Sequence, residues 1–516
     1  MPFVLGSLPL RWRLPSRNTE PWPSGLRLHP WLAALRDRGL WPPLADEARL
    51  HRPTGAVTGL TDVIVVGGGP AGCISALALC RLGLSVRLIE EHAGARPHVG
   101  EAISVAVLRQ LHDLGLEGVL YRAGWRRFSR CDERWASESW ITRDAPPGAA
   151  TLDRGRFDAA LGEICREAGV VVDLGRRATT AIRRSEGGWS VMLADGQVRG
   201  ANFLVDAAGR RGLLPKLRRW QGPRTIALYA YWSGAGLPDR PRVAAGEGVW
   251  AWGAPVADLG FNATLFTDRH ALPRSRGDLR QIYLDGLADT DLLPSFGTVL
   301  SCGQVTACDA SAWLDEEAVG PDYIKVGEAA QSFDPLASLG VQHCIQSARS
   351  ASVVVNTILR RPGSQAVARK YYEERLERSA WTHAVATTEI YGRSVHAEKP
   401  FWRSRCAGGA AVARVEAHPM SGPKPVASTP IHLDRSRVVE VPCLCGDFVE
   451  PRLAVLAGTE AEPVAFLGGI PIDMIVPAIV DSETVGDLLE ALVRGQAGTQ
   501  ADRICGWLIE RGVVGF

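Results

Sequence analysis

A glycine-rich turn is the first feature of this chain whose residue types and spacing could do chemistry. Gly67, Gly69 and Gly72 form the pattern G-x-G-x-x-G directly after the predicted strand 61–66, whose residues 63–66 are aliphatic. In this pattern the first glycine allows a tight turn, the second lets backbone amides approach a pyrophosphate, and the third lets a helix pack against the strand. Residues 70–82 are predicted to form that helix, whose N-terminal N–H groups and dipole attract the anion. The turn therefore predicts a dinucleotide site.

An acidic residue after the next predicted strand indicates the kind of dinucleotide. Residues 86–89 are mainly aliphatic, and Glu90 follows them at about the expected distance from the glycine turn. An acid at this place holds the two ribose hydroxyls and argues against a 2′-phosphate. The sequence therefore favours FAD or NAD over NADP. Strand, turn, helix, second strand and acid come in the order that the site requires, which leaves an unoccupied glycine-rich turn as the weaker alternative.

The composition limits the partners and the compartment of this 516-residue chain. Its 58 Lys and Arg against 56 Asp and Glu give a formal net charge of +2, which indicates neither nucleic acid nor an anionic membrane surface as a partner. No apolar run reaches the roughly 18 residues of a membrane-spanning helix, and the first residues lack the order of a secretory signal. The eleven cysteines are scattered, and the pair Cys443 and Cys445 lacks further metal ligands nearby. We therefore expect a reduced, cytoplasmic protein without a metal site.

Three further segments resemble motifs of the large flavoprotein monooxygenase superfamily. Residues 154–161 (RGRFDAAL) resemble its R-x-x-F-D-x-x-L helix, residues 203–210 (FLVDAAGR) its D-A-x-G strand end, and residues 326–341 (VGEAAQSFDPLASLGV) its G-D-A-A…D-P-x-x-x-x-G stretch. The motifs come in family order, and the resemblance covers residues 61–400. It implies an FAD cofactor in a Rossmann-type domain, with Arg154 among the cofactor-binding residues.

The same resemblance implies roles for residues at the cofactor. Asp206 and Gly209 would shape the crevice that holds it rather than do chemistry. Glu328 would accept a ribityl hydroxyl, where the family usually has the shorter Asp. The helix that follows Pro335 and Gly340 would aim its N-terminal amides at the flavin N1–C2=O edge, where negative charge collects on reduction.

Within that superfamily the sequence is similar to the flavin-dependent halogenase-like branch. Residues 99–104 (VGEAIS) resemble its G-E-S/A flavin-wall segment, and residues 250–255 (WAWGAP) resemble its W-x-W-x-I-P signature with Ala254 at the isoleucine. The resemblance implies that Glu101 braces the flavin segment. Arg109, on the helix after it, would pair with the pyrophosphate as an always-charged fork or lie on an exposed helix face.

Two tryptophans and one histidine are the candidate catalytic residues. Trp250 and Trp252 are two apart on a predicted strand, so both side chains point to one face, where they would wall a flavin or substrate channel. A half-buried aromatic strand is the alternative. His343 follows Gly340 closely and would serve as a base for a ring hydroxyl, with helix packing as its alternative.

Residues that halogenation requires are missing from this chain. The branch relies on a lysine soon after the G-E segment to handle hypohalous acid, and residues 126–135 (RRFSRCDERW) contain none. Arginine does not substitute readily, because its guanidinium stays protonated. Ala337 stands where tryptophan halogenases carry a glutamate. These differences favour oxygen transfer from a flavin C4a-hydroperoxide to an aromatic acceptor.

The resemblance also implies a class of substrate and an electron donor. The branch includes flavoproteins that mature tryptophan-derived quinone cofactors by oxidising a tryptophan in another protein, and this chain is similar to them in lacking the halogenase residues. We therefore expect an FAD-dependent monooxygenase acting on a Trp-like group in a peptide or carrier-bound substrate. A halogenase and a non-catalytic flavin-binding subunit are the alternatives. No second G-x-G-x-x-G follows a strand and opens a helix, so a separate flavin reductase would supply electrons.

The C-terminal segment, residues 430–516, has a pattern of its own. Alternating strand segments precede two helical patterns, one from Thr484 and one from Thr499. The segment loosely resembles PqqD-like winged-helix domains, which recognise leader peptides, and such a domain can add a peptide as an edge strand. A lid or a dimerisation module is the alternative. Arg503 and Arg511 are offset by neighbouring acids, which disfavours DNA binding.

These expectations define an α/β protein with four parts. We expect a Rossmann-type FAD-binding domain interleaved with a mixed β-sheet substrate domain, followed by a small α+β, winged-helix-like module. The expected boundaries are an N-terminal extension at 1–60, the oxidoreductase at 61–400 with its FAD part at 61–150, 151–220 and 320–400, a linker at 401–429, and the module at 430–516.

Overall fold

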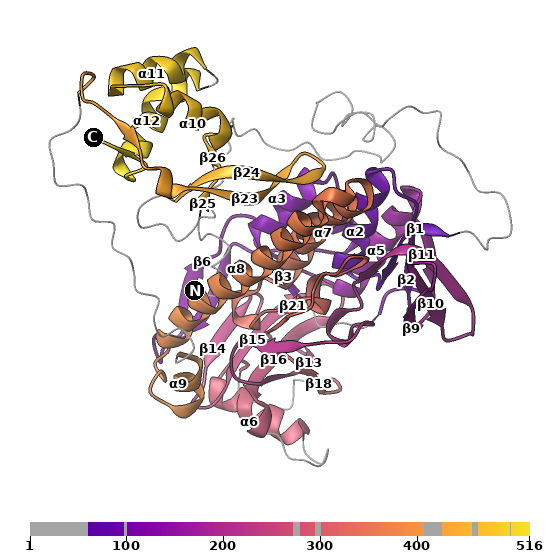
Figure 1. Cartoon of the computed structure of the whole chain (residues 1–516). Helices are drawn as coiled ribbons and strands as arrows, with labels where there is room; N and C mark the ends of the chain where they lie inside the picture. Colours follow the sequence, from indigo (N-terminus) through magenta and orange to yellow (C-terminus); the bar gives the residue numbers. More distant parts are fainter. Residues whose placement is uncertain are drawn as a thin grey trace. The chain divides into compact units, whose positions relative to one another are not determined.

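A computed structural model of the whole chain shows two compact units (Figure 1). The structure describes residues 60–96, 101–271, 279–294, 301–406, 426–456, 463–495 and 497–516. Unit 1 is Met1–Ser352 with Leu376–Ala410, and unit 2 is Val353–Arg375 with Ala411–Phe516. The division thus falls within two long helices, α7 (Gly340–Arg360) and α8 (Gln365–Gly392). The expected N-terminal extension lies outside the described residues except for Leu60.

A mainly parallel sheet in unit 1 carries the glycine turn. Its strands run in the order β8-β2-β1-β11-β10-β9, and β20 also pairs with β11. The pairs between β8, β2, β1, β11 and β20 are parallel, whereas β10 and β9 extend the sheet in antiparallel fashion. The bounds are β1 (Thr61–Val66), β2 (Val86–Glu90), β8 (Val171–Leu174), β9 (Ala178–Arg183), β10 (Trp189–Leu193), β11 (Val198–Asp206) and β20 (Tyr323–Lys325).

Local sequence explains why the first strand and helix form where they do. Val63, Ile64 and Val65 are fully buried, as expected for the central strand of a parallel sheet that is covered on both faces. Helix α2 (Pro70–Arg81) begins with proline at its first position, where the missing N–H costs no hydrogen bond. Helix α2 contacts α5 (Arg154–Glu167) beside the sheet (Figure 1).

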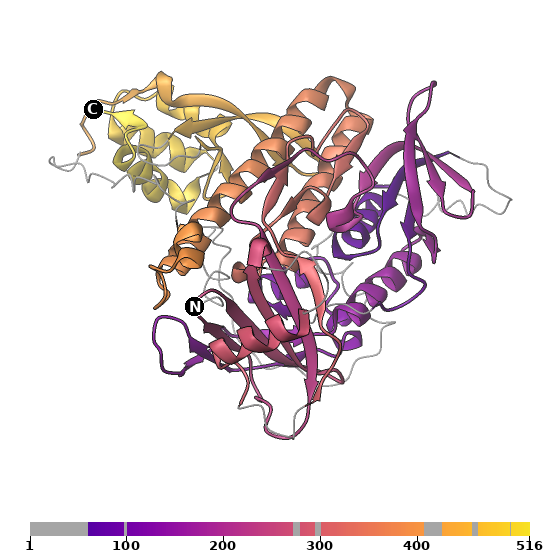
Figure 2. The ribbon, with the colours of Figure 1, turned by 90° about the horizontal axis from the view of Figure 1, so that it is seen from below.

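An eight-stranded, largely antiparallel sheet forms the second half of unit 1. Its order is β17-β13-β16-β15-β14-β5-β6, with β18 paired to β13. Helix α6 (Leu279–Thr290) lies against one face of it, where Tyr283 and Leu287 pack on Leu228 and Leu265 (Figure 2). The bounds are β5 (Arg130–Arg134), β6 (Ile141–Asp144), β13 (Thr225–Ser233), β14 (Arg242–Ala245), β15 (Trp250–Val256), β16 (Gly260–Asp268), β17 (Ser301–Cys302) and β18 (Thr306–Asp309).

Short elements join the two sheets of unit 1. Two three-stranded sheets have the orders β3-β7-β4 and β12-β19-β21, and single turns of 3-10 helix follow β11, β20 and β21. Their bounds are β3 (Glu101–Ile103), α3 (Val105–Asp113), α4 (Gly118–Arg122), β4 (Arg126–Arg127), β7 (Ala150–Leu152), η3 (Gly209–Arg211), η4 (Arg269–Ala271), β12 (Arg218–Trp220), β19 (Trp313–Asp315), η6 (Gly327–Ala329), β21 (Gln331–Ser332) and η7 (Pro335–Ala337). The short helix η8 (Pro362–Ser364) instead lies between α7 and α8, in unit 2.

The structure differs from the expected boundaries at three places. Val353–Arg375, expected in the FAD part, belongs to unit 2. Residues 130–144, assigned above to the FAD part, form β5 and β6 of the eight-stranded sheet, because β5 pairs in parallel with β14. Residues 401–406, assigned to the linker, belong to helix α9 (Pro400–Cys406). Phe401 and Trp402 are buried in an aromatic cluster there, whereas the Gly- and Ala-rich composition begins only at residue 407.

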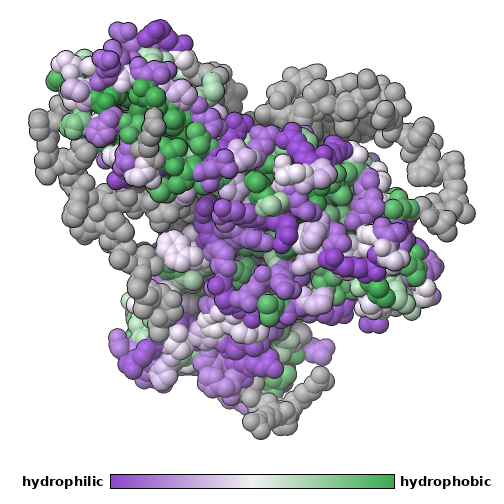
Figure 3. Space-filling model, viewed as in Figure 1, coloured by the Kyte–Doolittle hydropathy of each residue, from purple (hydrophilic) through white to green (hydrophobic). Residues whose placement is uncertain are grey.

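In its described residues, unit 2 contains three small β-sheets and the helices α10, α11 and α12, besides the ends of α7 and α8. The sheets have the orders β23-β24-β25, β22-β28 and β26-β27, and a core that includes Val455, Ile472, Leu488 and Leu508 joins them to the helices. Hydrophobic side chains also gather on the surface over α10 (Figure 3). The bounds are β22 (His432–Leu433), η10 (Arg435–Arg437), β23 (Val438–Cys445), β24 (Phe448–Leu456), β25 (Pro463–Val464), β26 (Phe466–Leu467), β27 (Ile470–Pro471), α10 (Ile472–Val480), α11 (Val485–Arg494), η11 (Gly498–Gln500), α12 (Ala501–Glu510) and β28 (Val514–Gly515).

No helix within the described parts of the chain is both long enough and apolar enough to cross a membrane.

The contact between α2 and β1 predicts a severe effect of one added methyl group. A Cβ atom at Gly72 would lie 1.8 Å from the Gly67 carbonyl oxygen, so Gly72→Ala must displace backbone. We expect roughly 1–3 kcal/mol lower unfolding free energy and weakened FAD binding, measured by denaturant unfolding and FAD titration. Gly162→Ala on α5 is the matched control, because nothing lies within 4 Å of its new Cβ atom. Its stability should be unchanged or higher by up to about 1 kcal/mol, and an equal loss in both variants would contradict this account.

Candidate functional site

A cavity of about 780 Å³ opens in unit 1 where the parallel sheet meets the antiparallel one. It lies at the carboxyl end of β1 and β11, the edge at which open α/β sheets bind ligands. The sequence-predicted residues that line it are Gly67, Gly69, Glu90, Arg154, Gly209, Trp250, Trp252, Glu328, Pro335, Gly340 and His343.

Three of the other sequence-predicted residues, Gly72, Asp206 and Arg109, do not line the cavity. Gly72 is buried between α2 and the glycine turn, and Asp206 is buried beneath the wall. Arg109 is exposed on α3, so the structure places it on an outer helix face and not where a pyrophosphate would bind. The backbone of Glu101 pairs with Leu152 in β3, and its side chain lies outside the described residues.

Two glycines of the cavity differ in their surroundings. Backbone packs closely against Gly67, whereas the space next to Gly69 is open. Gly67 has φ +106°, and a Cβ atom there would lie 2.3 Å from the Ala207 carbonyl oxygen. At Gly69, the nearest atom to an added Cβ would be Arg96 Nη2 at 3.8 Å. The chain therefore turns tightly at Gly67 and leaves room over Gly69, in front of the N-terminus of α2.

Asp206 holds the opposite wall of the cavity through its backbone. Its carboxylate accepts hydrogen bonds from the N–H groups of Ala208 (3.1 Å), Leu213 (2.7 Å) and Leu214 (2.8 Å). Burial raises the pKa of the Asp206 carboxyl, and these N–H groups oppose the rise. Asp206 therefore fixes the turn that carries Gly209, in agreement with a structural role.

Contacts within the protein alone fix the position of the Glu90 carboxylate. One carboxylate oxygen accepts the Gly68 N–H at 2.6 Å, and the other accepts the His92 N–H at 2.8 Å. The His92 ring nitrogen Nδ1 also lies 2.8 Å from that second oxygen. The carboxylate is thereby oriented at the end of β2, where remaining lone pairs can accept ribose hydroxyls.

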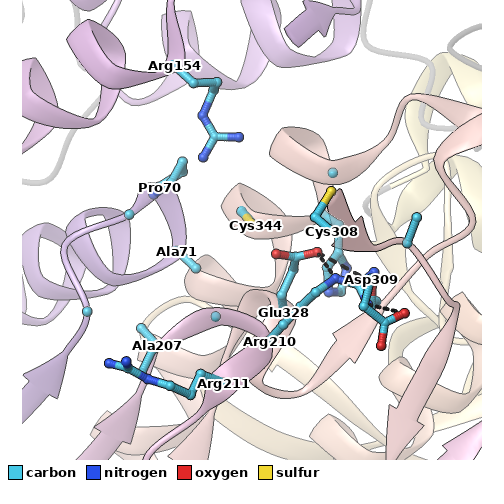
Figure 4. A pocket seen from close by; sticks show the side chains of 18 of the residues that line it. Pro70, Ala71, Arg154, Ala207, Arg210, Arg211, Cys308, Asp309, Glu328 and Cys344 are labelled. Atoms are coloured by element: carbon cyan, nitrogen blue, oxygen red, sulfur yellow. Dashed lines mark hydrogen bonds and ion pairs between the residues drawn. The ribbon is translucent and has the colours of Figure 1, made fainter. Parts of the chain in front are cut away.

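Two arginines bring positive charge to the space over the glycine turn. Arg154 reaches from α5 toward Pro70 (Figure 4), and its Nε donates to Asp158 at 3.2 Å. Arg96 approaches the same Asp158 carboxylate at 3.5 Å and also lines the cavity. Arg96 was not predicted from the sequence, because nothing in its local pattern distinguishes it from a surface residue of the loop after β2.

Glu328 is held by an arginine that the sequence analysis did not single out. Arg210 Nε donates to Glu328 at 3.1 Å, and both Nη groups donate to the Ser311 carbonyl oxygen at 3.0 and 3.1 Å (Figure 4). Arg210 also contacts the Ser332 hydroxyl and lies 3.8 Å from Asp309. The longer glutamate is thus drawn toward the cavity wall. The place of Arg210 directly after the D-A-A-G motif is the signal that could have identified it.

The loop after β21 reaches the cavity from the other side. Asp334 caps the short helix η7 by accepting the Leu336 N–H at 3.0 Å, and the Tyr391 hydroxyl donates to its carboxylate at 3.0 Å. Burial raises the pKa of the Asp334 carboxyl. Ser338 then adopts φ +51° before α7 begins at Gly340. Side-chain capping thus shapes the turn that brings α7 to the cavity.

Two histidines flank Phe333 in this loop. The ring of His343 lies 4.6 Å from that of Phe333, and the ring of His383 stacks on it at 4.3 Å. His343 is buried and lines the cavity. Burial lowers the pKa of His383 to about 3, and the neighbouring His343 contributes in the same direction. The two imidazole rings and Phe333 thus pack together and support the cavity wall.

Aromatic side chains of β15 and β16 wall the wide part of the cavity. Trp250 stacks on Phe266 with ring centroids 3.9 Å apart and rings nearly parallel. Trp252 and Thr264 line the cavity beside them. Both tryptophans therefore lie on the face expected from their spacing of two.

The donor set around the cavity fits FAD. A glycine turn with open space, a helix N-terminus and two guanidinium groups suit a pyrophosphate, and the fixed Glu90 suits a ribose. Gly209 also faces open space, with no atom within 4 Å of an added Cβ. The aromatic wall suits a flat ring. No cluster of three or more His, Cys, Asp or Glu side chains that could hold a metal occurs in the described part of the chain.

Comparison with protein families agrees with this site. Residues 62–215 match the family model described as FAD dependent oxidoreductase, and residues 145–412, more than half of the chain, match the one described as tryptophan halogenase. The chain belongs to the tryptophan halogenase family. This family member is an FAD-dependent oxidoreductase enzyme, as the sequence motifs predicted.

Individual relatives include both halogenases and a hydroxylase. A tryptophan 2-halogenase of Chondromyces crocatus is 27% identical over 369 residues, covering 67% of this chain and 70% of the relative. A flavin-dependent halogenase of Armillaria mellea is also 27% identical over 369 residues, covering 61% and 68%. The solved structure of the peptidyl tryptophan dihydroxylase QhpG, essential for tryptophylquinone cofactor biogenesis, has TM-score 0.69 and 30% identity, covering 88% of this chain and 100% of that one. The flavin-dependent halogenase CmlS shares the fold at TM-score 0.68 and 19% identity, covering 89% and 96%.

The Arg210 network predicts a cofactor-binding defect that a lysine does not repair. In Arg210→Lys, the ammonium cannot contact Glu328 and Ser311 together, because the planar fork is lost. We expect about tenfold weaker FAD binding, measured by quenching of flavin fluorescence. Arg219→Lys is the control, since Arg219 pairs with Glu377 and does not line the cavity. Equal affinities in the two variants would contradict the role of Arg210.

The depressed pKa of His383 predicts a pH-dependent stability. The folded protein keeps His383 neutral down to about pH 3, whereas the unfolded chain binds a proton near pH 6.5. The unfolding free energy should therefore fall as pH decreases from about 6.5 towards 3, by at most about 1.4 kcal/mol per pH unit from this group. His383→Gln should remove that part of the slope in urea unfolding at a series of pH values. His270→Gln, at an exposed position, should not, and an unchanged slope in both variants would refute the assignment.

Proposed function

We propose that this family member is an FAD-dependent monooxygenase that oxidises a Trp-like aromatic group in a peptide or carrier-bound substrate. The observation that carries the proposal is the absence of lysine from the described residues that line the cavity. Halogenases of this branch need such an amine next to the acceptor. A site without it has no group to deliver the halogen, whereas an oxygen atom needs no carrier residue.

The positions of the lysines support this point. The chain has five, and among them Lys325 is buried in an ion pair with Asp315 at 2.6 Å. Lys399 pairs with Glu247 at 3.0 Å at the surface. Lys216 and Lys370 are described and do not line the cavity, and Lys424 lies outside the described residues.

The cavity residues suit binding and orientation of a flat acceptor. When bound, reduced FAD supplies the activation of dioxygen. Trp250, held rigid against Phe266, and Trp252 would sandwich or wall an indole-sized ring and exclude water from it. His343, which is buried and lines the same cavity, would accept the proton of a ring hydroxyl or N–H. These three residues are the proposed catalytic group.

The nature of the acceptor rests on similarity. QhpG, by its name, acts on a tryptophan in a peptide, and the likeness to it extends over 88% of this chain. The halogenases match at lower identity. We infer a peptide-borne tryptophan as the preferred acceptor and a separate flavin reductase as the electron donor. We further propose that the strands and helices of unit 2 form a winged-helix-like module that holds the peptide.

Product masses test the proposed function. The FAD-loaded protein is reduced, then mixed with dioxygen, bromide and a synthetic peptide that contains one tryptophan. We expect the peptide to gain oxygen, with no gain in a matched peptide whose tryptophan is replaced by phenylalanine.

Two other outcomes would overturn the proposal in different ways. A bromine isotope doublet on the peptide would make the protein a halogenase despite its missing lysine. FAD binding with no change in the mass of any aromatic peptide or free aromatic compound would leave a flavin-binding subunit as the function.

A further inference from the structure

Strand β23 forms one side of the three-stranded sheet of unit 2 and has an open edge. Within the described parts of the chain, its eight residues pair with β24 on one side, and no strand pairs with the other side. None of its residues is buried, and Glu440 and Leu444 are exposed. An unpaired strand of this length can template a further strand.

Hydrogen bonds of β24 show which way the backbone of this hairpin points. The Leu453 N–H donates to Asp473 at 2.8 Å, and the Val449 N–H donates to the Thr357 hydroxyl at 2.9 Å. Both N–H groups therefore point away from β23. In an antiparallel pair of strands, two residues that face each other are alike. The backbone N–H and C=O groups of both point toward the partner strand, or those of both point away from it.

The β23 residues opposite Leu453 and Val449 must therefore also point their backbone N–H and C=O groups away from the partner strand, toward the open edge. Glu440 faces Leu453, and Leu444 faces Val449. Pro442 faces Pro451 between them, which fits only an outward-pointing pair, because neither proline has an N–H to give to the ladder. The open edge thus presents the N–H and C=O groups of Glu440 and Leu444, and the C=O of Pro442.

We propose that this edge binds an extended segment of the peptide or protein substrate as an added antiparallel strand. The inference rests on the proposed function, because that function requires a polypeptide partner. Exposed backbone groups at every second residue match the spacing of another extended backbone, which can replace the water bound to them; this is the basis of β-augmentation. Unit 2 would thereby hold a part of the substrate other than the tryptophan that is oxidised.

Pro442 and Glu440 favour a partner of different sequence over a second copy of the chain. Two copies of β23 paired about a twofold axis would bring two missing donors and two like charges into one short ladder. With a substrate strand as the partner, the ladder contains only one missing donor, at Pro442, and one such charge, at Glu440. A basic residue opposite Glu440 and an apolar residue opposite Leu444 would complete the pairing.

The outward direction of these N–H groups gives a sharp pair of variants. Glu440→Pro removes an edge donor without removing a hydrogen bond of the hairpin, whereas Glu440→Ala removes the side chain and keeps the donor. Leu444→Pro and Leu444→Ala repeat the comparison one pair further along. The full-length protein is used to select binders from a random peptide library, and the most enriched peptide, labelled with a fluorophore, is the probe.

We expect each proline variant to weaken binding of the probe about tenfold, and each alanine variant to weaken it less than about threefold. Hydrogen exchange on the unaltered protein is the second measurement. The amides of Glu440 and Leu444 should exchange fast in the free protein and slowly with the probe bound, which keeps the test valid if a proline variant does not fold.

Three results would overturn the proposal. The first is equal binding of the probe by the proline variants and the unaltered protein. The second is slow exchange of both amides in the free protein, which would mean that another segment or a second copy covers the edge. The third is fast exchange of both amides with the probe bound. Binding is measured without reducing the flavin. Loss of oxygen transfer with binding intact would therefore contradict the proposed function alone, and intact transfer with an unused edge would contradict the docking site alone.

Discussion

The contact of three backbone segments around Gly67 is the constraint on which the active site depends. The Gly67 carbonyl oxygen lies where a Cβ atom of Gly72 would stand, and the Ala207 carbonyl oxygen lies where a Cβ atom of Gly67 would stand. Strand β1, helix α2 and the turn after β11 can therefore approach only because two side chains are absent. This approach opens the space in front of the α2 N-terminus and brings Gly209 to the same cavity. The remaining cofactor residues are placed relative to this core.

Much of the cofactor site could be predicted from the sequence, because its signals are local. The glycine spacing, Glu90 at the end of β2 and the tryptophans two apart each depend on neighbouring residues in one element. The parallel sheet was predicted from the continuous aliphatic run at residues 63–66. Family motifs then ordered these pieces and indicated FAD, which the family comparison confirmed.

The features that the sequence missed depend on contacts between distant segments. Arg210 meets Ser311 across 101 residues and Glu328 across 118, and no local pattern encodes such partners. Residues 130–144 were expected in the FAD part, whereas they form β5 and β6 of the other sheet, because the partner of β5, β14, comes about a hundred residues later. Arg109 has the right charge at a plausible place, yet the rotation of α3 turns it outward. The direction in which Arg109 faces depends on how α3 packs against the rest of the protein, and its place in the sequence does not determine that packing.

Arg210 connects segments that belong to the two halves of unit 1. One rigid guanidinium joins the turn after β11, the segment that carries Glu328, and the strand end at Ser311. Strand β18, which precedes Ser311, pairs with β13 of the aromatic-walled sheet. Because the Arg210 Nη groups bond to the segment that continues β18 while its Nε bonds to Glu328, one guanidinium ties the position of Glu328 at the cavity to the position of the aromatic-walled sheet.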